Sequence, residues 1–503
     1  MKFDVFSEAQ RVGPRDEGAL YRDVLEQARL ADELGFTTWW MVEHHGAGEY
    51  SYSSAPELIL SWIATQTDRI RLGHSGVLAP FKINHPIRAA ERAAMLDHIS
   101  GGRLEFGMAR SLGGEWDAFD VEVETTRDQL VEALRMIPQM WTQERFSWNS
   151  KLLRIPERNL IPKPVQKPHP PIWSTTGSPA AFRLAGSLGV GALGNTLLTT
   201  LDGIALLLRE YDAGLAECEQ PAGLFRNARR SVFTFVHVAD SEKAAVESGA
   251  CNAALWYMAR MPEVFHAPAD NVWELIRGGL LPNNPADIRA VASIDPASMA
   301  RQANEHPVVD LVKRYAAGEA ISHEEAYEML SPLPSVIVGD PATCRKKAEG
   351  YADLGVDQHH LGVSELVEAF DTQFAAVAGE LASAEGYRIV VEERHVHPHH
   401  AGLDLVHGPH RFGEILGVDV GAQSEARAVG EADRPALVDA ENGIWYDVQN
   451  GSQQVANCFG AAPEPRFVAA AEPLANGKQQ NNAKQRGNYD ERCLIGIDRI
   501  HGQ

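Results

Sequence analysis

The sequence has no long apolar run, no paired cysteines and no excess of basic charge. Its five cysteines are scattered over 503 residues without a Cys-x-x-Cys spacing, which argues against a zinc or disulfide framework and for a reducing compartment. No segment approaches the roughly 20 apolar residues of a membrane-spanning helix. The net charge of −22 argues against nucleic-acid binding and against docking on an anionic membrane.

Two further signals are missing. The first ten residues already have the pattern of a strand and lack the basic and apolar segments of a signal peptide. No GxGxxG fingerprint follows any apolar run, which weakens a doubly wound, dinucleotide-binding sheet. We therefore expect a soluble, cytoplasmic protein that binds neither nucleic acid nor membrane.

Over residues 2–383 the sequence alternates short apolar runs with helical periodicity. The predicted strands are 2–7, 37–45, 69–78, 103–110, 172–176, 190–194 and 231–238. The last two predicted strands of the series are 335–339 and 358–363. The predicted helices are 19–34, 55–68, 86–100, about 126–141, 179–188, 201–215, 341–354 and 366–381. Eight strand–helix units in about 380 residues predict an α/β protein with a (β/α)8 TIM barrel.

Two regions do not fit the barrel repeat. Residues 240–334 exceed one unit and are predicted to be an insertion after the seventh strand. Residues 384–503 form a C-terminal extension rich in Gly, Gln, Asn and His, which we expect to be irregular or disordered, and to which we assign no function. The histidine-rich run between His395 and His410 could bind metal, but its prolines and irregular spacing favour an exposed cluster. We predict no metal site.

The second predicted strand delivers Glu43, His44 and His45 at its carboxyl end. Parallel α/β folds carry their chemistry at this end of the strands, so an active site is expected there. Strand alternation would turn His44 away from Glu43 and His45, leaving one histidine to face the barrel mouth. The alternative is a histidine pair that only caps a loop.

A hydroxyl-rich turn lies between the fifth predicted strand and its helix: Thr175-Thr176-Gly177-Ser178. Hydroxyls, backbone amides and a helix N-terminus together can bind a phosphate. Arg110, at the end of the fourth strand, offers a planar cation to the same dianion. The alternative is an ordinary helix cap and a surface arginine.

Four patterns in order resemble those of the bacterial luciferase-like flavin-dependent monooxygenases, most closely the alkanal monooxygenase alpha chain. They are EHH after the second strand, HPIRAAERAAMLDHISGGRLEFGMAR, PKPVQKPHPPIW and VIVGDPATCRKKAEGYADLGVDQ. The resemblance covers residues 1 to about 383 and leaves the extension out.

The resemblance implies a barrel that binds reduced FMN at its carboxyl-terminal face, with the flavin supplied by a separate flavin reductase and O2 as co-substrate. It implies that His44 is the catalytic imidazole, since a pKa near 6.5 permits proton exchange at neutral pH. Glu43 and His45 would contact substrate or support His44. The family carries a cis peptide under the flavin ring, and Ser75–Gly76 is the matching pair. A homodimer through the second and third helices is also implied, with Ala89, Ala90, Ala93 and Ala94 permitting close approach.

One position departs from the luciferase pattern. Ala109 stands where luciferases carry a reactive cysteine, which argues against light emission but not against monooxygenation. The expected reaction is oxidation of a small organic substrate, such as an aldehyde, by reduced FMN and O2. Two alternatives stay open: a deazaflavin-dependent dehydrogenase on the same barrel, and a non-catalytic flavin-binding subunit.

Overall fold

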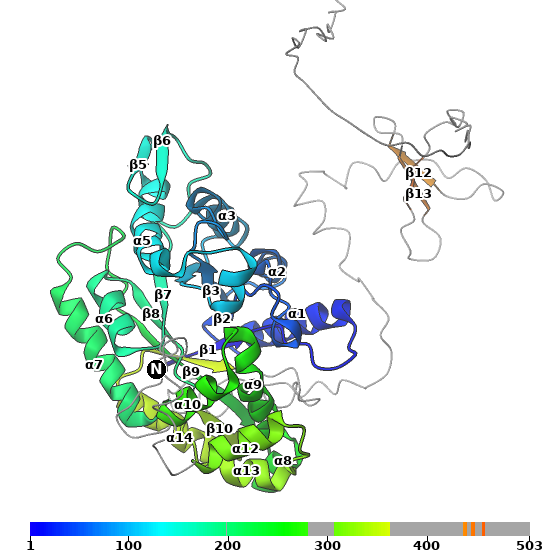
Figure 1. Cartoon of the computed structure of the whole chain (residues 1–503). Helices are drawn as coiled ribbons and strands as arrows, with labels where there is room; N and C mark the ends of the chain where they lie inside the picture. The colour runs from blue at the N-terminus through cyan, green and yellow to red at the C-terminus, as the bar shows by residue number, and fades with distance from the viewer. Residues whose placement is uncertain (198, 280–305, 363–435, 440–443, 448–454, 458–503) are drawn as a thin grey trace, which may run out of the picture. The chain divides into compact units, whose positions relative to one another are not determined.

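The computed structural model describes residues 1–197, 199–279 and 306–362, with three short stretches at 436–439, 444–447 and 455–457 (Figure 1). The chain divides into two units, Met1–His395 and Val396–Gln503. The predicted helix 366–381 and the histidine-rich run lie outside the described residues. Within the described parts, no helix combines the length and apolar character needed to cross a membrane.

Eight parallel strands of the first unit close into a barrel. They are β1 (Lys2–Ser7), β2 (Thr38–Met41), β3 (Arg71–Leu78), β4 (Leu104–Ala109), β7 (Ile172–Thr176), β8 (Gly191–Gly194), β9 (Arg230–Val238) and β11 (Gln358–Gly362). Each pairs with the next, and β11 pairs with β1 to complete the ring. A further strand, β10 (Val336–Gly339), pairs with the end of β9. The predicted TIM barrel is confirmed.

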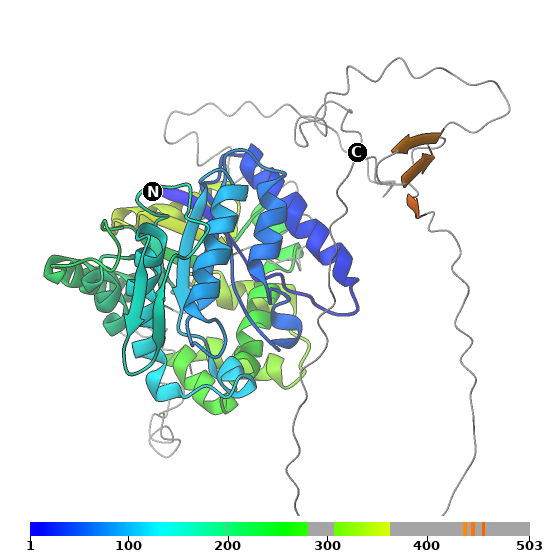
Figure 2. The ribbon, with the colours of Figure 1, turned by 90° about the horizontal axis from the view of Figure 1, so that it is seen from above.

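Helices surround this barrel (Figure 2). They are α1 (Glu17–Glu33), α2 (Pro56–Ala64), α3 (Pro86–Ile99), α5 (Thr126–Thr142), α6 (Pro179–Ser187), α7 (Leu201–Glu217) and α14 (Pro341–Asp353). Proline at the first helical position and a capping side chain fix several of their starts, as at Ser178 and Asp340. Most of the predicted helices therefore lie within a few residues of their observed bounds.

Strand β2 is shorter than predicted, because it ends at Met41 rather than at residue 45. The next residues bond to a loop instead of a strand: Ser53 Oγ donates to the carbonyl of Val42, and His44 N–H donates to the carbonyl of Ser53. Glu43, His44 and His45 consequently lie in a loop, so strand alternation does not set their directions.

Helix α3 does not present its alanines for contact between copies of the chain. Ala89, Ala90, Ala93 and Ala94 are buried in the chain's own core, and Trp141 Nε1 of α5 donates to the carbonyl of Ala90 at 2.9 Å. The predicted role of these alanines in dimerisation is therefore wrong. The exposed apolar side chains of α2 and α3 are instead Leu58, Trp62, Met95 and Ile99.

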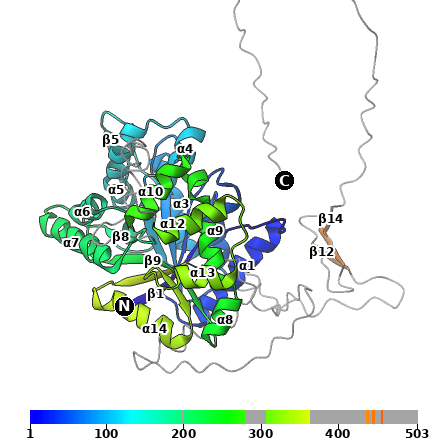
Figure 3. The same ribbon diagram turned by 60° about the horizontal axis from the view of Figure 1, so that its bottom comes forward.

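The insertion predicted after the seventh strand is helical (Figure 3). Its described helices are α8 (Glu242–Glu247), α9 (Ala250–Phe265), α10 (Ala269–Gly279), α12 (Pro307–Ala316) and α13 (His323–Leu330). Apolar residues of α9, α12 and α13 form one buried cluster with residues of β9 and β10. The insertion is thus packed on the barrel through its own apolar core.

Several short elements were not predicted. They are the hairpin β5 (Phe146–Asn149) and β6 (Arg154–Arg158), the short helix α4 (Gly113–Ala118), and the 3-10 turns η1 (Gly48–Tyr50) and η2 (Val123–Thr125). Helix α4 begins with two glycines, which are poor helix formers and have the pattern of a turn. It nevertheless carries a residue of the site described below.

In the second unit, β12 (Ala436–Asp439), β13 (Ile444–Asp447) and β14 (Val455–Asn457) form an antiparallel sheet. No strand was predicted in this region, although Trp445 and Tyr446 are residues that favour strands. The division of the chain at residue 383 and the irregular character of the rest of the extension stay predictions.

Side chains fill the amino-terminal part of the barrel interior. Trp40, Trp173 and Leu193 form a small apolar cluster there. The buried carboxylate of Glu105 accepts hydrogen bonds from Arg71 at 2.6 Å, Arg229 at 2.8 Å and Trp173 Nε1 at 2.6 Å. Chemistry is therefore confined to the carboxyl-terminal mouth.

Candidate active site

His44 lies in the loop after β2, between two buried carboxylates. Its Nδ1 is 2.9 Å from Glu115 Oε1, and its Nε2 is 3.9 Å from Glu8 Oε2. Glu8 directly follows β1, and Glu115 lies on α4 after β4. The ends of three barrel strands therefore bring these side chains together, at the edge where TIM barrels carry their active sites.

Glu115 is held in place by its own surroundings. One carboxylate oxygen contacts His44, and the other accepts hydrogen bonds from Leu112 N–H at 2.9 Å and Ser111 Oγ at 3.1 Å. Burial alone would raise the pKa of Glu115, but the hydrogen bond and charge of His44, with the Leu112 and Ser111 donors, outweigh burial and lower it. Glu115 is thus an anion that fixes the orientation of the imidazole.

Glu8 is the second buried carboxyl group. Its Oε1 accepts a hydrogen bond of 2.8 Å from the hydroxyl of Tyr257 on α9, and its Oε2 has no hydrogen-bond partner within the described residues. Burial raises the pKa of Glu8 to about 6, although the charge of His44 and the hydrogen bond from Tyr257 oppose the shift. Glu8 can therefore gain or lose a proton near neutral pH.

Two tyrosines complete the surroundings of His44. The ring of Tyr50, from η1, lies edge-on to His44 with 5.9 Å between centroids and packs on Tyr257 at 4.8 Å. Burial raises the pKa of both phenols well above the ordinary value, so both remain neutral. They exclude water and supply hydrogen bonds without adding charge.

The protonation of His44 is set by competing effects. Burial lowers the pKa of His44, but the hydrogen bond and charge of Glu115 and the charges of Glu8 and Glu43 exceed that effect and raise it. His44 therefore stays doubly protonated up to a higher pH than a free histidine does. With Glu8 beside it, the site pairs an imidazole whose pKa is raised with a carboxyl group whose pKa is also raised.

Glu43 and His45 contact each other rather than His44. His45 Nε2 is 3.1 Å from Glu43 Oε1, and Glu43 Oε2 accepts the N–H of Leu78 at 2.9 Å. Asn84 Nδ2 also donates to Glu43 Oε1 at 2.8 Å. Glu43 thus ties the loop after β2 to the end of β3 and to the start of α3.

The Ser75–Gly76 peptide bond in β3 is cis. A Cβ on Gly76 would lie 2.7 Å from the carbonyl carbon of Met108 in β4, so only glycine allows this approach of the two strands. The pairing of β3 with β4 also shifts register here, between His74 and Val77.

The hydroxyl-rich turn and Arg110 lie at the same edge of the barrel, because β4 pairs with β7 and Met108 is opposite Ser174. Ser178 caps α6 through the N–H of Ala181, and Thr176 Oγ1 is 3.3 Å from the carbonyl of Leu193. Thr175 Oγ1 is buried, and within the described residues it has no hydrogen-bond partner. Alternation places Thr175 on the face of β7 that carries Trp173, toward the barrel interior.

The Arg110 side chain is anchored to η2, α5 and α4. Its Nε donates to Thr126 Oγ1 at 2.6 Å, and its guanidinium also donates to the carbonyl of Val123. The central carbon of the guanidinium lies 5.1 Å from the centroid of the Trp116 ring. An unsatisfied hydroxyl, an N-terminal helix turn with Gly177 and an oriented arginine fit a phosphate group.

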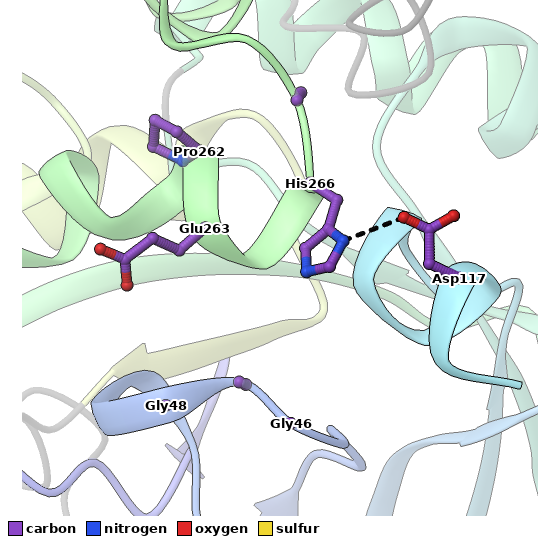
Figure 4. Close-up of a pocket in the computed structure, with 8 residues that line it drawn as sticks. Gly46, Gly48, Asp117, Pro262, Glu263 and His266 are labelled. Carbon is purple, nitrogen blue, oxygen red and sulfur yellow. Dashed lines mark hydrogen bonds and ion pairs between the residues drawn. The ribbon is translucent and has the colours of Figure 1, made fainter.

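A cavity of about 500 Å³ lies beside the site. It is lined by the loop that follows His45, by Asp117 of α4 and by the end of α9 (Figure 4), namely by Gly46, Ala47, Gly48, Asp117, Pro262, Glu263, His266 and Ala267. The volume lies in the range of small-molecule sites. The cavity borders the two segments that carry His44 and Glu115.

Four residues around His44 were not singled out from the sequence: Glu8, Tyr50, Glu115 and Tyr257. Glu8 had the same signal as Glu43, since it directly follows an apolar strand. Tyr257 had none, because it belongs to the insertion and lies 249 positions from its partner.

The mouth of this barrel thus joins an imidazole, two buried carboxylates and a hydroxyl-rich turn at the edge where TIM barrels carry their active sites. The luciferase-like monooxygenase family model matches residues 1–358, and the chain belongs to this family. The predicted resemblance is confirmed.

Two curated proteins that are similar to the chain use different flavin-type cofactors. Over 333 residues the chain is 27% identical to the oxygenase component of flavin-dependent trigonelline monooxygenase of Acinetobacter baylyi, covering 65% of this chain and 88% of that protein. Over 355 residues it is 24% identical to F420-dependent glucose-6-phosphate dehydrogenase of Kineococcus radiotolerans, covering 69% and 88%.

Among solved structures, one similar protein is the oxygenating constituent of 3,6-diketocamphane monooxygenase from Pseudomonas putida, a Type II Baeyer-Villiger monooxygenase in complex with FMN. The TM-score is 0.57 at 17% identity, covering 76% of this chain and 98% of that chain. This likeness shows the fold alone.

Proposed function

We propose that the protein is the oxygenase component of an FMN-dependent monooxygenase that oxidises a small organic substrate. The observation that carries this proposal is His44, held between Glu115 and Glu8 at the carboxyl-terminal mouth of the barrel. A cavity of about 500 Å³ is lined by Gly46 and Asp117, which lie two residues from His44 and from Glu115. The name of the Acinetobacter baylyi relative, an oxygenase component, supports a separate flavin reductase as the source of reduced FMN.

The phosphate of FMN would be held by the turn from Thr175 to Ser178 and by Arg110. The buried hydroxyl of Thr175 would gain the partner it lacks among the described residues, and the charge of Arg110 would neutralise the dianion. The flavin ring would lie against the backbone of Ser75–Gly76, as the family resemblance implies. Bound reduced FMN supplies the electrons that activate O2.

The protein's own part in the reaction is proton transfer. Glu115 binds Nδ1 of His44, so Nε2 is the nitrogen that exchanges protons. The 3.9 Å between Nε2 and Glu8 Oε2 exceeds a hydrogen bond, so Nε2 is near Glu8 without donating to it. Tyr50 and Tyr257 keep this space free of bulk water.

A deazaflavin-dependent dehydrogenase is the second candidate, favoured by the likeness to the Kineococcus radiotolerans enzyme over 355 residues. A paired imidazole and carboxyl group serve hydride chemistry as well as oxygenation, so His44 and Glu8 do not separate the two. A non-catalytic flavin-binding subunit is disfavoured, because two buried carboxylates around one imidazole cost stability without a function.

Cofactor binding followed by oxygen uptake tests the proposal. The purified full chain is titrated with reduced FMN, FAD, NAD and a deazaflavin under anaerobic conditions, and air is then admitted with candidate aldehydes and heteroaromatic substrates. We expect the tightest binding for reduced FMN and O2 uptake that matches product formation. Preference for the deazaflavin, with hydride transfer and no O2 uptake, would establish the second candidate instead.

We also propose a homodimer formed through α2 and α3. Leu58, Trp62, Met95 and Ile99 expose between 41% and 70% of their surface on these two neighbouring helices. Exposed apolar side chains gathered on one face mark a protein interface more often than a free surface. This apolar face replaces the alanines as the basis for dimerisation.

A further inference from the structure

Helix α9 of the insertion is linked to both carboxyl groups that flank His44. Tyr257, in its second turn, donates to Glu8. Its C-terminal end, at Val264 to His266, packs against α4, the short helix that carries Glu115. Seven residues separate Tyr257 from Val264, or about 10 Å of helix at 1.5 Å per residue. One helix, with Pro262 in its last turn, therefore contacts both carboxyl-bearing segments.

The contact between α4 and the end of α9 is unusually close. A Cβ on Gly113 would overlap the carbonyl oxygen of Phe265, and one on Gly114 would lie 3.2 Å from the carbonyl oxygen of Val264. The two glycines at the start of α4 thus allow backbone to meet backbone.

A side-chain contact holds the same two elements together (Figure 4). His266 Nδ1 is 3.0 Å from Asp117 Oδ2, and the His266 ring lies over Gly114. His266 has a φ of 45°, in the left-handed region where glycine is the usual residue. Histidine at this position directs an imidazole at α4, which glycine could not do.

We propose that α9 is a positioning element of the active site: by docking α4 through Gly113, Gly114 and the Asp117–His266 pair, it sets the hydrogen bond between Glu115 and His44. The proposal deepens the proposed function, since it concerns the group that transfers protons there. It assigns the insertion after β9 a part in catalysis that the barrel alone does not supply.

The charged and titratable groups that face His44 come from four elements. Glu115 lies on α4, Glu8 follows β1, Glu43 lies in the loop of His44 itself, and Tyr50 lies in η1. Glu115 is the largest influence that raises the pKa of His44, against burial, which lowers it. Moving α4 away from His44 should therefore lower that pKa, and this is measurable without flavin or substrate.

The experiment is histidine NMR on the flavin-free full chain labelled with 15N-histidine. The His44 signal is identified by its loss in His44→Gln, and Glu115→Gln gives the reference decrease in its pKa. We expect Gly113→Ala to reproduce most of that decrease and Gly114→Ala a smaller part, because its overlap is smaller. The matched control is Gly350→Ala in α14, where a Cβ would lie 3.4 Å from Leu201 Cδ1 and should leave His44 unchanged.

A double variant distinguishes positioning from a general loss of structure. Gly113→Ala should have no further effect on His44 once Glu115→Gln is present, because both act through one hydrogen bond. An unchanged pKa of His44 in Gly113→Ala, or an equal further decrease in the double variant, would overturn the proposal. If Gly113→Ala does not fold, Gly114→Ala and the exposed Asp117→Ala decide by the same criterion.

Activity provides a second measurement. A displacement of about 1 Å can cost on the order of a hundredfold in rate, so turnover of Gly113→Ala should fall roughly tenfold to a hundredfold with FMN affinity unchanged. If no oxygenase activity is found in any variant, the proposed function fails while the NMR result still decides the role of α9. If the enzyme is active but the pKa of His44 does not change in the α4 variants, only the proposed role of α9 is refuted.

Discussion

Replacing Tyr257 with phenylalanine should raise the acid limit of activity. The phenol donates a 2.8 Å hydrogen bond to Glu8, whose pKa burial already raises to about 6. A hydrogen bond to a charged group is worth about 1.5 to 3 kcal/mol, and 1.36 kcal/mol corresponds to one pKa unit. Since protonated Glu8 keeps part of that interaction, we expect an increase of about one unit.

The assay is the pH dependence of kcat/KM with saturating reduced FMN, for the full chain and for Tyr257→Phe. In this ratio the acid limb reports groups of the free enzyme, and we expect it to move from near pH 6 toward pH 7 in the variant. Tyr351→Phe is the matched control, because its hydroxyl is equally buried but has no hydrogen-bond partner among the described residues. An acid limb that stays in place in Tyr257→Phe would refute the assignment of Glu8 as the titrating carboxyl group.

Four further outcomes are expected. Substituting His44 by alanine should lower product formation by about 10²- to 10⁴-fold while O2 is still reduced to hydrogen peroxide, whereas His45→Ala should be milder; coupled turnover in His44→Ala would contradict the catalytic role. In Arg110→Ala, FMN affinity measured by fluorescence titration should fall roughly tenfold to a hundredfold, and an unchanged affinity would place the phosphate elsewhere. The pKa of Glu8 in the folded protein is raised to about 6. Folding is therefore favoured at a pH below the pKa of Glu8 in the unfolded chain, where the group is protonated, and this contribution to stability is lost as pH rises through 6. Denaturant unfolding should therefore find Glu8→Gln more stable than the parent by about 2 kcal/mol at pH 8 and by nothing at pH 4, and a gain at both pH values would point to packing instead. Finally, Trp62→Glu should shift the mass found by light scattering from dimer to monomer, and a parent chain that is already monomeric would remove the dimer proposal.

Those parts of the fold that depend on local pattern could be predicted from the sequence. The start of α3 at Pro86 and the cap of α6 at Ser178 agree with the structure, because proline and serine act on neighbouring backbone groups. The end of β2 could not be predicted, because Ser53, which bonds the backbone on both sides of Glu43, lies on the far side of a loop.

The candidate site also has one part that local sequence pattern predicts and another part that it does not. The end of an apolar strand, a local signal, pointed to Glu43, His44 and His45 together, and the choice of His44 among them rested on the family resemblance. Its partner Glu115 is 71 positions away, and only the neighbouring strands of a closed barrel bring the two together. Tyr257 is more distant still, since its place depends on how an insertion packs on the barrel. Predicting contacts of this kind requires the order of the strands and the packing of the insertion, as well as the hydrophobic pattern of the sequence.

The group of Glu105, Arg71, Arg229 and Trp173 closes the barrel at one end, and this has a kinetic consequence. In the flavin enzyme proposed above, cofactor and substrate would share the opening at the carboxyl ends of the strands. Whichever of them binds deeper would have to arrive first and depart last, and an excess of the outer ligand would slow turnover by retaining the spent flavin.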